Sequence, residues 1–222
     1  MKHIVFAVAI FIPCLSVAFS SLQEQVSYYQ SLYNHPKNTV EISMSRMNAG
    51  ETRPKAVLKG VYYFGGTNVK RQALSSQYRS LLCQNGFSQT FSVYTSVNTT
   101  VKCDQNEMMY AHIGQAKHAR DGGPKVIDLI ERIYAVIKSN GELGPIYLHC
   151  FYGVHASNTI SQMVLKQFCG ISDREAFENW DRVNLYNSLP DPGPRKEKAK
   201  IAAFQPDPRF KITQAEKNLI CY

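Results

Sequence analysis

A histidine and a cysteine, His149 and Cys150, lie side by side between two apolar segments in GPIYLHCFYGVHASNTISQMVLKQF, residues 144–168. The run 146–148 is short and β-favouring, and residues 160–168 have apolar side chains at helical spacing. This pattern predicts a strand, a tight loop and a helix. A loop that opens a helix directs backbone N–H groups inward, where they can hold an anion such as phosphate. Cys150 at the start of such a loop would be a thiolate nucleophile, and the alternative is a buried structural cysteine.

The segment HCFYGVHAS resembles the active-site loop of the cysteine-dependent protein tyrosine and dual-specificity phosphatases. The family pattern is His-Cys, five residues, Arg, and then Ser, Thr or Gly. His149, Cys150, Gly153 and Ser157 match it, whereas Ala156 stands where the family has its arginine. The resemblance implies a phosphate-binding loop that follows His149 and Cys150 and consists of Phe151, Tyr152, Gly153, Val154, His155, Ala156 and Ser157.

Upstream segments extend the resemblance to small bacterial-type members of this family. LKGVYYFGGTN, residues 58–68, is similar to the strand and Gly-Gly turn that open those proteins. Residues 74–87 are typical of a helix, 88–97 alternate as a strand does, 108–115 resemble a shorter strand, and 125–141 carry a helical apolar stripe. This order predicts an α/β fold with a central, mostly parallel sheet flanked by helices, and the loop at the carboxyl ends of the strands.

In the resembled family the cysteine attacks phosphorus, an aspartate protonates the leaving oxygen, and the arginine holds the equatorial oxygens. The resemblance assigns the first role to Cys150 and the second to Asp121; His118 is an alternative acid, and Asp121 is alternatively a turn or cap residue. Loss of the arginine would cost about 3–5 kcal/mol of transition-state stabilisation, or ~10² to 10⁴ in rate. Arg120 is a possible substitute cation, as is a protonated His155, but neither reproduces the planar two-point contact.

These features predict a pseudophosphatase that binds a phosphorylated or otherwise anionic ligand or protein partner. One alternative is a weak or atypical phosphatase acting on phosphoproteins, inositol phosphates or similar monoesters. Another is an interaction protein whose site has decayed. No cofactor is expected. No metal site is expected either, because the only close Cys/His pair, His149 and Cys150, cannot easily face one ion.

The first twenty residues have the composition of a signal peptide. Lys2 and His3 precede an apolar run over 4–19, and small residues within 18–20 suit a signal peptidase. The competing interpretation is a membrane anchor, which is disfavoured because the run is short and interrupted by Pro13. We therefore expect export to the periplasm or the medium, with no stable membrane insertion after cleavage.

The rest of the chain is predicted to form one globular domain with a segment on either side. After the signal peptide over 1–20, we expect an N-terminal extension over 21–56 that packs partly on the core. The phosphatase-like domain would cover 57–188, and a Pro-rich basic tail 189–222. The 222 residues, 44% hydrophobic and 19% charged, are sufficient for a single core.

Export affects how the cysteines are interpreted, since thiols outside the cytoplasm tend to pair. Without Cys14, five remain, so at least one thiol stays free. Cys83 and Cys103 flank the 88–97 strand and are candidates for one disulfide, and Cys169 and Cys221 for another, which would leave Cys150 free. The alternative is that all five are separate reduced thiols.

The chain is basic, with 25 Lys and Arg against 17 Asp and Glu and a formal net charge of +8. Such an excess favours phosphorylated ligands, anionic lipid head groups or polyanions as partners, and the alternative is a merely soluble basic surface. No zinc-finger or aromatic-basic ribonucleoprotein motif is present, so nucleic-acid binding is not expected.

Overall fold

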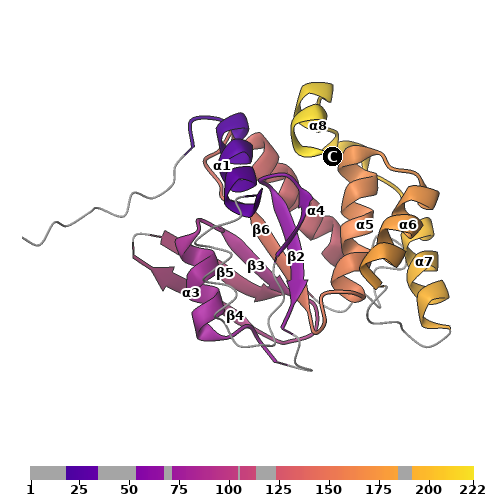
Figure 1. Cartoon of the computed structure of the whole chain (residues 1–222), viewed down its shortest axis with the longest axis horizontal. Coiled ribbons are helices and arrows are strands. Elements are labelled where there is room, and N and C mark those ends of the chain that lie inside the picture. The colour runs from indigo at the N-terminus through magenta and orange to yellow at the C-terminus, as the bar shows by residue number, and fades with distance from the viewer. Residues whose placement is uncertain (1–18, 35–53, 68–71, 105, 114–123, 185–191) are drawn as a thin grey trace, which may run out of the picture.

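A computed structural model describes residues 19–34, 54–67, 72–104, 106–113, 124–184 and 192–222. The described residues form a six-stranded sheet in the order β1-β2-β6-β3-β5-β4, with helices on both faces (Figure 1). The strands are β1 (Lys55–Leu58), β2 (Tyr62–Gly66), β3 (Gln89–Ser92), β4 (Asn98–Cys103), β5 (Asn106–His112) and β6 (Ile146–Cys150).

The four inner strands of the sheet, β2, β6, β3 and β5, are mutually parallel, and only the edge strands β1 and β4 are antiparallel to their neighbours. Every residue of β6 is buried, which is typical of a parallel strand covered on both faces. The predicted α/β fold with a mostly parallel central sheet is therefore confirmed, and β6 lies inside the sheet as expected.

Strand β4 was missed in the sequence, and the predicted 88–97 strand is shorter than expected, since β3 spans Gln89–Ser92. β4 pairs only with β5, and most of its side chains are exposed. An edge strand with this exposure has no apolar alternation to reveal it. Asp104, with φ of 48°, lies between these two strands, in a conformation that aspartate tolerates better than most residues.

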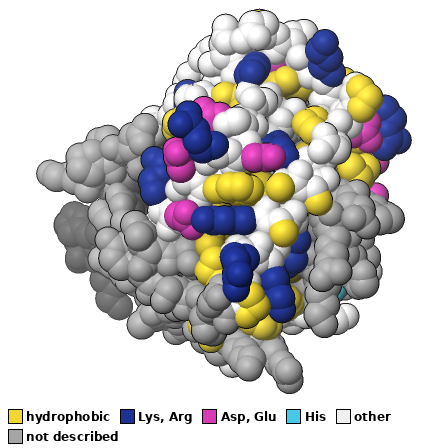
Figure 2. All heavy atoms as spheres, turned by 90° about the vertical axis from the view of Figure 1, so that its right-hand side faces the viewer, with side chains coloured by type: hydrophobic (Ala, Val, Ile, Leu, Met, Phe, Trp, Pro, Cys, Tyr) yellow, Lys and Arg dark blue, Asp and Glu magenta, His cyan; other side chains and the backbone are white. Residues whose placement is uncertain are grey.

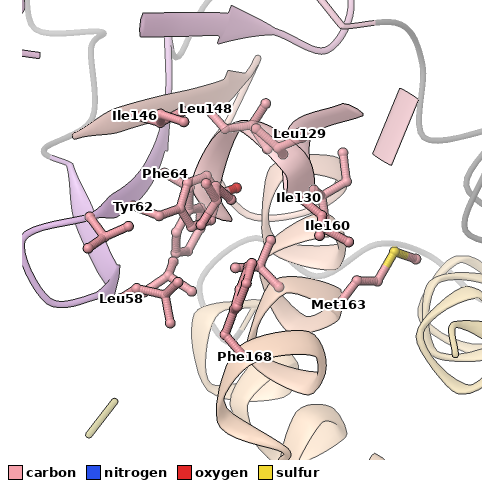
Figure 3. Packing of buried hydrophobic residues seen from close by; sticks show 14 of the residues in the cluster. Leu58, Tyr62, Phe64, Leu129, Ile130, Ile146, Leu148, Ile160, Met163 and Phe168 are labelled. Atoms are coloured by element: carbon pink, nitrogen blue, oxygen red, sulfur yellow. The ribbon is translucent and has the colours of Figure 1, made fainter. Parts of the chain in front are cut away.

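Alternate side chains of the inner strands bury two separate apolar clusters. Tyr62, Phe64 and Leu148 point to the face covered by α4 (Pro124–Lys138) and α5 (Ala156–Cys169), where Figure 3 shows them near side chains of both helices. Tyr63 and Tyr147 point to the opposite face, against α3 (Ser76–Gln84). The helix α1 (Leu22–Asn34), which lies within the expected N-terminal extension, contributes to both clusters.

The C-terminal residues do not form a separate tail after residue 188. They form α7 (Gly193–Ala203), η2 (Pro208–Phe210) and α8 (Gln214–Ile220), after α6 (Asp173–Asn184), and the C-terminus lies beside α5 (Figure 1). Phe204, Phe210 and Ile220 are buried in the cluster shared with α4 and α5. The Lys166 ammonium donates to the carbonyl oxygens of Ile201 and Phe204 at 2.9 and 2.8 Å. The expected domain boundary therefore cuts through a continuous core.

Charges of both signs are mixed on the face that α6 and α7 help to form (Figure 2). Lys198 pairs with Asp181 at 2.7 Å, and Lys200 pairs with Glu197 at 2.5 Å. The basic α7 segment is thus largely a solvated helix surface rather than a uniform cationic patch. Within the described part of the chain, no helix combines the length and the hydropathy needed to span a bilayer. No cluster of potential metal ligands is found among the described residues.

Candidate functional site

The central strand β6 delivers His149 and Cys150 to the carboxyl end of the parallel sheet. The chain bends over residues 151–155, and α5 begins at Ala156. Gly153 has φ of 65°, a left-handed conformation that a residue with a Cβ atom rarely adopts. The strand, loop and helix that the motif predicts are present, and the loop reverses direction at its glycine.

The Cys150 sulfur lies at the base of this loop and is hydrogen-bonded from two sides. The Gly153 N–H donates to Sγ at 3.2 Å, and the Ser157 hydroxyl oxygen lies 3.1 Å from Sγ. Ser157 can instead donate to the Gly65 carbonyl at 3.2 Å, so its single proton serves one acceptor at a time. These two contacts fix the position of the sulfur at the start of the loop.

The Cys150 side chain is only 3% exposed. This burial leaves no local pattern in the sequence, because the end of another strand, β2, lies against the loop. Gly66, at the end of β2, lies directly against the loop: a Cβ atom there would be 2.3 Å from the Gly153 nitrogen. The Thr67 N–H donates to the Cys150 carbonyl at 3.3 Å. The end of β2 therefore fixes the back of the loop.

His149 is buried beside the loop and is held by the sheet. Its Nε2 lies 2.9 Å from the Tyr110 hydroxyl oxygen, and its Nδ1 lies 3.4 Å from the Cys150 carbonyl oxygen. The Tyr110 hydroxyl also accepts the Leu74 N–H at 3.0 Å. Burial lowers the pKa of His149 to about 4, because the charged form would lose its hydration. The imidazole is therefore neutral at neutral pH and positions the strand end.

Aromatic side chains form the outer part of the loop. The Phe151 ring stacks on Tyr94, with centroids 4.7 Å apart and planes 26° apart. Tyr152 contacts the His155 ring edge-on at 6.5 Å. Tyr94 and Tyr152 are 37% and 39% exposed, so these rings are accessible to a ligand. Partial burial, with smaller contributions from Cys150 and Glu197, raises the pKa of Tyr94 to about 12.

Ala156 occupies the first turn of α5 and is 2% exposed, in contact with the apolar core. Three residues later, the Thr159 hydroxyl donates to the Glu197 carboxylate at 2.7 Å and accepts the Trp180 indole N–H at 3.0 Å. The first turn of α5 therefore has a buried alanine, Ala156, and an acidic side chain from α7 nearby. Lys200 pairs with Glu197 and offsets that negative charge.

Glu197 and Tyr94 were not predicted from the sequence. Tyr94 was assigned to a strand that in fact ends at Ser92, and Glu197 lies in a segment expected to be a tail. Neither residue is near the motif in the chain, so no local pattern connects them with it. Asp121, His118 and Arg120, the proposed acids and substitute cation, lie outside the described residues.

The cysteines other than Cys150 are paired in the described part of the chain. Cys83 is bonded to Cys103 with Cα atoms 6.0 Å apart, and Cys169 to Cys221 with Cα atoms 5.8 Å apart. Cys150 is the free cysteine among the described residues. The second disulfide joins the end of α5 to the residue after α8.

No protein-family model matches the chain, and no curated protein matches it. Among the solved structures that are similar to it are two phosphatases, one described as a PTP and the other as a DUSP. The first, described as Tk-PTP in the active form, has a TM-score of 0.46 and 15% identity, and the match covers 68% of this chain and 95% of that one. The second, DUSP15, has a TM-score of 0.43 and 16% identity, covering 78% and 93%.

Proposed function

We propose that the chain is an exported, phosphatase-like protein whose loop after Cys150 binds a phosphorylated or otherwise anionic ligand or protein, with little or no turnover. One observation carries this proposal. The Cys150 sulfur sits between the Gly153 N–H and the Ser157 hydroxyl at the start of a strand-loop-helix turn, while Ala156 puts a methyl group where a clamping cation would be needed. The nucleophile is in place and the charge clamp is not.

The remaining parts of the loop can bind an anion more readily than they can transform it. Backbone N–H groups and the start of α5 favour negative charge in the bound state. Transition-state stabilisation of a transferring phosphoryl group needs a positioned cation, and its loss costs about 3–5 kcal/mol. The loop can therefore still bind an anion, although loss of the cation reduces the rate of phosphoryl transfer by ~10² to 10⁴.

Among the described residues, Lys55 is a cation in contact with the backbone of the loop. Its ammonium donates to the Gly153 carbonyl at 3.4 Å. The Gly153 N–H donates to the Cys150 sulfur, so Lys55 and the thiol contact the same loop residue. Lys55 can hold the loop in shape, but it does not replace a guanidinium that grips two phosphate oxygens. His155, at the end of the loop, and Arg120 are the substitutes that the proposal retains.

Ala156→Arg tests the missing clamp. We expect this variant to raise hydrolysis of a small aryl phosphate from near background by ~10² or more, because the thiol already stands in place. Ala156→Gln, similar in length but uncharged, should gain nothing. Cys150→Ser in the Ala156→Arg background should abolish the activity.

Two other results would change the proposal. Efficient turnover by the unmodified protein, lost on Arg120→Ala, would mean that the cation has migrated and the protein is an enzyme. Titration calorimetry with tungstate, a phosphate-like oxyanion, should show binding to the unmodified protein. If neither tungstate nor phosphate binds and Ala156→Arg gains nothing, the protein is an interaction protein with a decayed site.

Export is proposed from residues 1–20 together with the cysteine pairing. Disulfides are favoured in oxidising compartments, and two are formed in the described residues. N-terminal sequencing of the protein recovered from the periplasm or the medium should begin close to residue 21. A full-length chain that stays with the cytoplasmic fraction would contradict export.

A further inference from the structure

A groove of about 620 Å³ lies at the β1 edge of the sheet, between β1, α5 and α6, with Phe64 of β2 in its wall. Its volume is within the range of small-ligand sites. Apolar side chains form much of the wall, among them Val57, Phe64, Leu165, Ile171 and Val183. The loop residues 151–157 are not among those that line it, so the groove is a second candidate site.

One polar atom in the groove wall lacks a partner. Gln162 is 3% exposed, and its Oε1 is buried without a hydrogen bond. The orientation of its amide is fixed by a chain of contacts: Nε2 donates to Asn158 Oδ1 at 2.9 Å, and Asn158 Nδ2 donates to the Trp180 carbonyl at 3.1 Å. Because a backbone carbonyl can only accept, Oε1 of Gln162 is left as the free acceptor. A buried acceptor of this kind favours a ligand that brings an N–H or O–H donor.

A cation lies in the wall of the same groove. The Lys55 side chain is half-buried over the Phe64 ring, with Nζ 5.3 Å from the centroid, and it makes one long hydrogen bond to the Gly153 carbonyl. No ion pair of the described residues includes Lys55. A half-buried ammonium group without a carboxylate partner is complementary to a carboxylate on a ligand.

One acidic residue of the groove is engaged as a helix cap. The Glu175 carboxylate accepts from the Ser172 N–H at 2.8 Å and from its hydroxyl at 2.7 Å, at the start of α6. Glu178 and Arg182 also line the groove, and the Arg182 guanidinium donates to Asn179 Oδ1. Both of these side chains are exposed, so Lys55 is the half-buried charge of the groove.

We propose that this groove binds the C-terminal end of an apolar peptide, with the terminal carboxylate at Lys55, a backbone N–H donating to Gln162 Oε1 and apolar side chains against Phe64 and Val183. The cation, the buried acceptor and the apolar side chains of the groove match the carboxylate, the N–H and the apolar side chains of such a peptide end. A fatty acid would satisfy Lys55 and the apolar wall, but it has no N–H for Gln162. The peptide is therefore the better complement.

Fluorescence anisotropy with a labelled tetrapeptide of Ala, Ile, Leu and Val tests the proposal. The peptide with a free carboxylate should bind about tenfold more tightly than the same peptide with a C-terminal amide, and Lys55→Met should remove that difference. An ester oxygen in place of the last N–H of the peptide should weaken binding to the unmodified protein about tenfold. The Gln162→Met variant should bind the ester no more weakly than it binds the amide-linked peptide.

Gln25→Met is the matched control. Gln25 also has a buried, unpartnered Oε1 and also donates through Nε2, to the Gly60 carbonyl at 2.8 Å, but it does not line the groove. It should leave peptide affinity unchanged. Cys150→Ser should do the same, which separates this site from the loop.

Several outcomes would overturn the proposal. One is equal affinity for the peptide with a free carboxylate and the peptide with a C-terminal amide. A second is an equal loss of peptide affinity in Gln25→Met and Gln162→Met. A third is binding of decanoate as tight as that of the peptide. If a substituted protein fails to fold, amide chemical-shift mapping on the unmodified protein decides the matter. Perturbations should centre on β1 and α6, and their absence there would rule the site out.

Discussion

His149 and Cys150 are adjacent in the chain, but their side chains have different surroundings. His149 contacts the Tyr110 hydroxyl across the sheet, whereas the Cys150 sulfur faces Gly153 and Ser157 within the loop. Because burial keeps the pKa of His149 near 4, the imidazole carries no charge at neutral pH. At the scale of single residues, the histidine fixes the strand end, and the thiol is the group that faces the loop.

The buried histidine makes stability depend on pH. In the unfolded chain His149 takes up a proton near its ordinary pKa of 6.5, whereas in the fold it does so only near 4. Stability is therefore fully present above pH 6.5 and is lost as the pH falls from 6.5 towards 4, by on the order of 3 kcal/mol in total. His149→Gln should show a flatter dependence in urea unfolding between pH 6.5 and 5. Equal slopes for both proteins in that window would contradict the assignment.

The pH window also separates His149 from the carboxylates. Glu24 and Glu175 have lowered pKa values because Ser20 and Ser172, respectively, donate hydrogen bonds to them. Their contribution is present above their ordinary pKa of 4.5 and is lost below it, so they add little to the slope between pH 6.5 and 5. For that reason, above pH 5 the difference in slope between the unmodified protein and His149→Gln comes from His149 and not from these carboxylates.

At the scale of elements, the loop depends on the end of β2 as much as on its own sequence. β2 pairs in parallel with β6, so that Gly65 lies opposite His149 and Gly66 opposite Cys150. This register brings Gly66 against the loop backbone and places the Gly65 carbonyl within reach of the Ser157 hydroxyl. The Gly-Gly pair thus leaves room for the loop to lie on the strand.

Gly66→Ala should displace the loop. The added methyl group would meet backbone atoms of Gly153 and Tyr152 at 2.3 and 2.5 Å, and such atoms cannot move independently of the loop. We expect a loss of about 1–3 kcal/mol in the free energy of unfolding and faster alkylation of Cys150 by iodoacetamide, as the thiol loses its cover.

Gly144→Ala serves as the control for this change. Its Cβ would lie 1.7 Å from the Gly86 carbonyl oxygen, so it also overpacks a backbone, but it precedes β6 and lies at the opposite end of that strand from the loop. It should destabilise the protein without altering the alkylation rate of Cys150 in the folded state. If Gly66→Ala leaves that rate unchanged while destabilising as expected, the end of β2 does not determine the loop geometry.

The C-terminal residues close the molecule at the largest scale. Phe204, Phe210 and Ile220 complete the cluster over α4 and α5, and the Cys169–Cys221 disulfide joins the chain end to α5. Glu197 on α7 reaches the first turn of α5 through Thr159. The whole molecule therefore includes its C-terminal segment in both its core and its candidate site.

Replacing Cys169 and Cys221 by alanine should lower the free energy of unfolding by about 2–4 kcal/mol, because the disulfide closes a loop of 52 residues in the unfolded chain. Replacing Cys83 and Cys103, which close 20 residues, should cost about 1 kcal/mol less on the same grounds. Urea unfolding of the oxidised proteins measures both values. A larger loss for the Cys83 and Cys103 pair would show that local packing, not chain closure, dominates.

The sequence by itself determined the strand, loop and helix around Cys150, the helical stripe of α4 and the mostly parallel character of the sheet. The first two depend on local periodicity, and the third on the alternation of strands and helices along the chain. The assignment of Ala156 to the position of the family arginine rests on the resemblance of the motif and stays a prediction.

Only the tertiary structure decided the burial of Cys150, the placement of Tyr94 and Glu197 near the loop, and the groove with the unpartnered Gln162 oxygen. It also made residues 192–222 part of the core instead of a tail. Each of these involves residues far apart in the chain, such as Thr159 and Glu197, 38 positions apart. Periodicity reports which face of an element is apolar, but it does not report which distant element covers that face, and so these contacts leave no local pattern in the sequence.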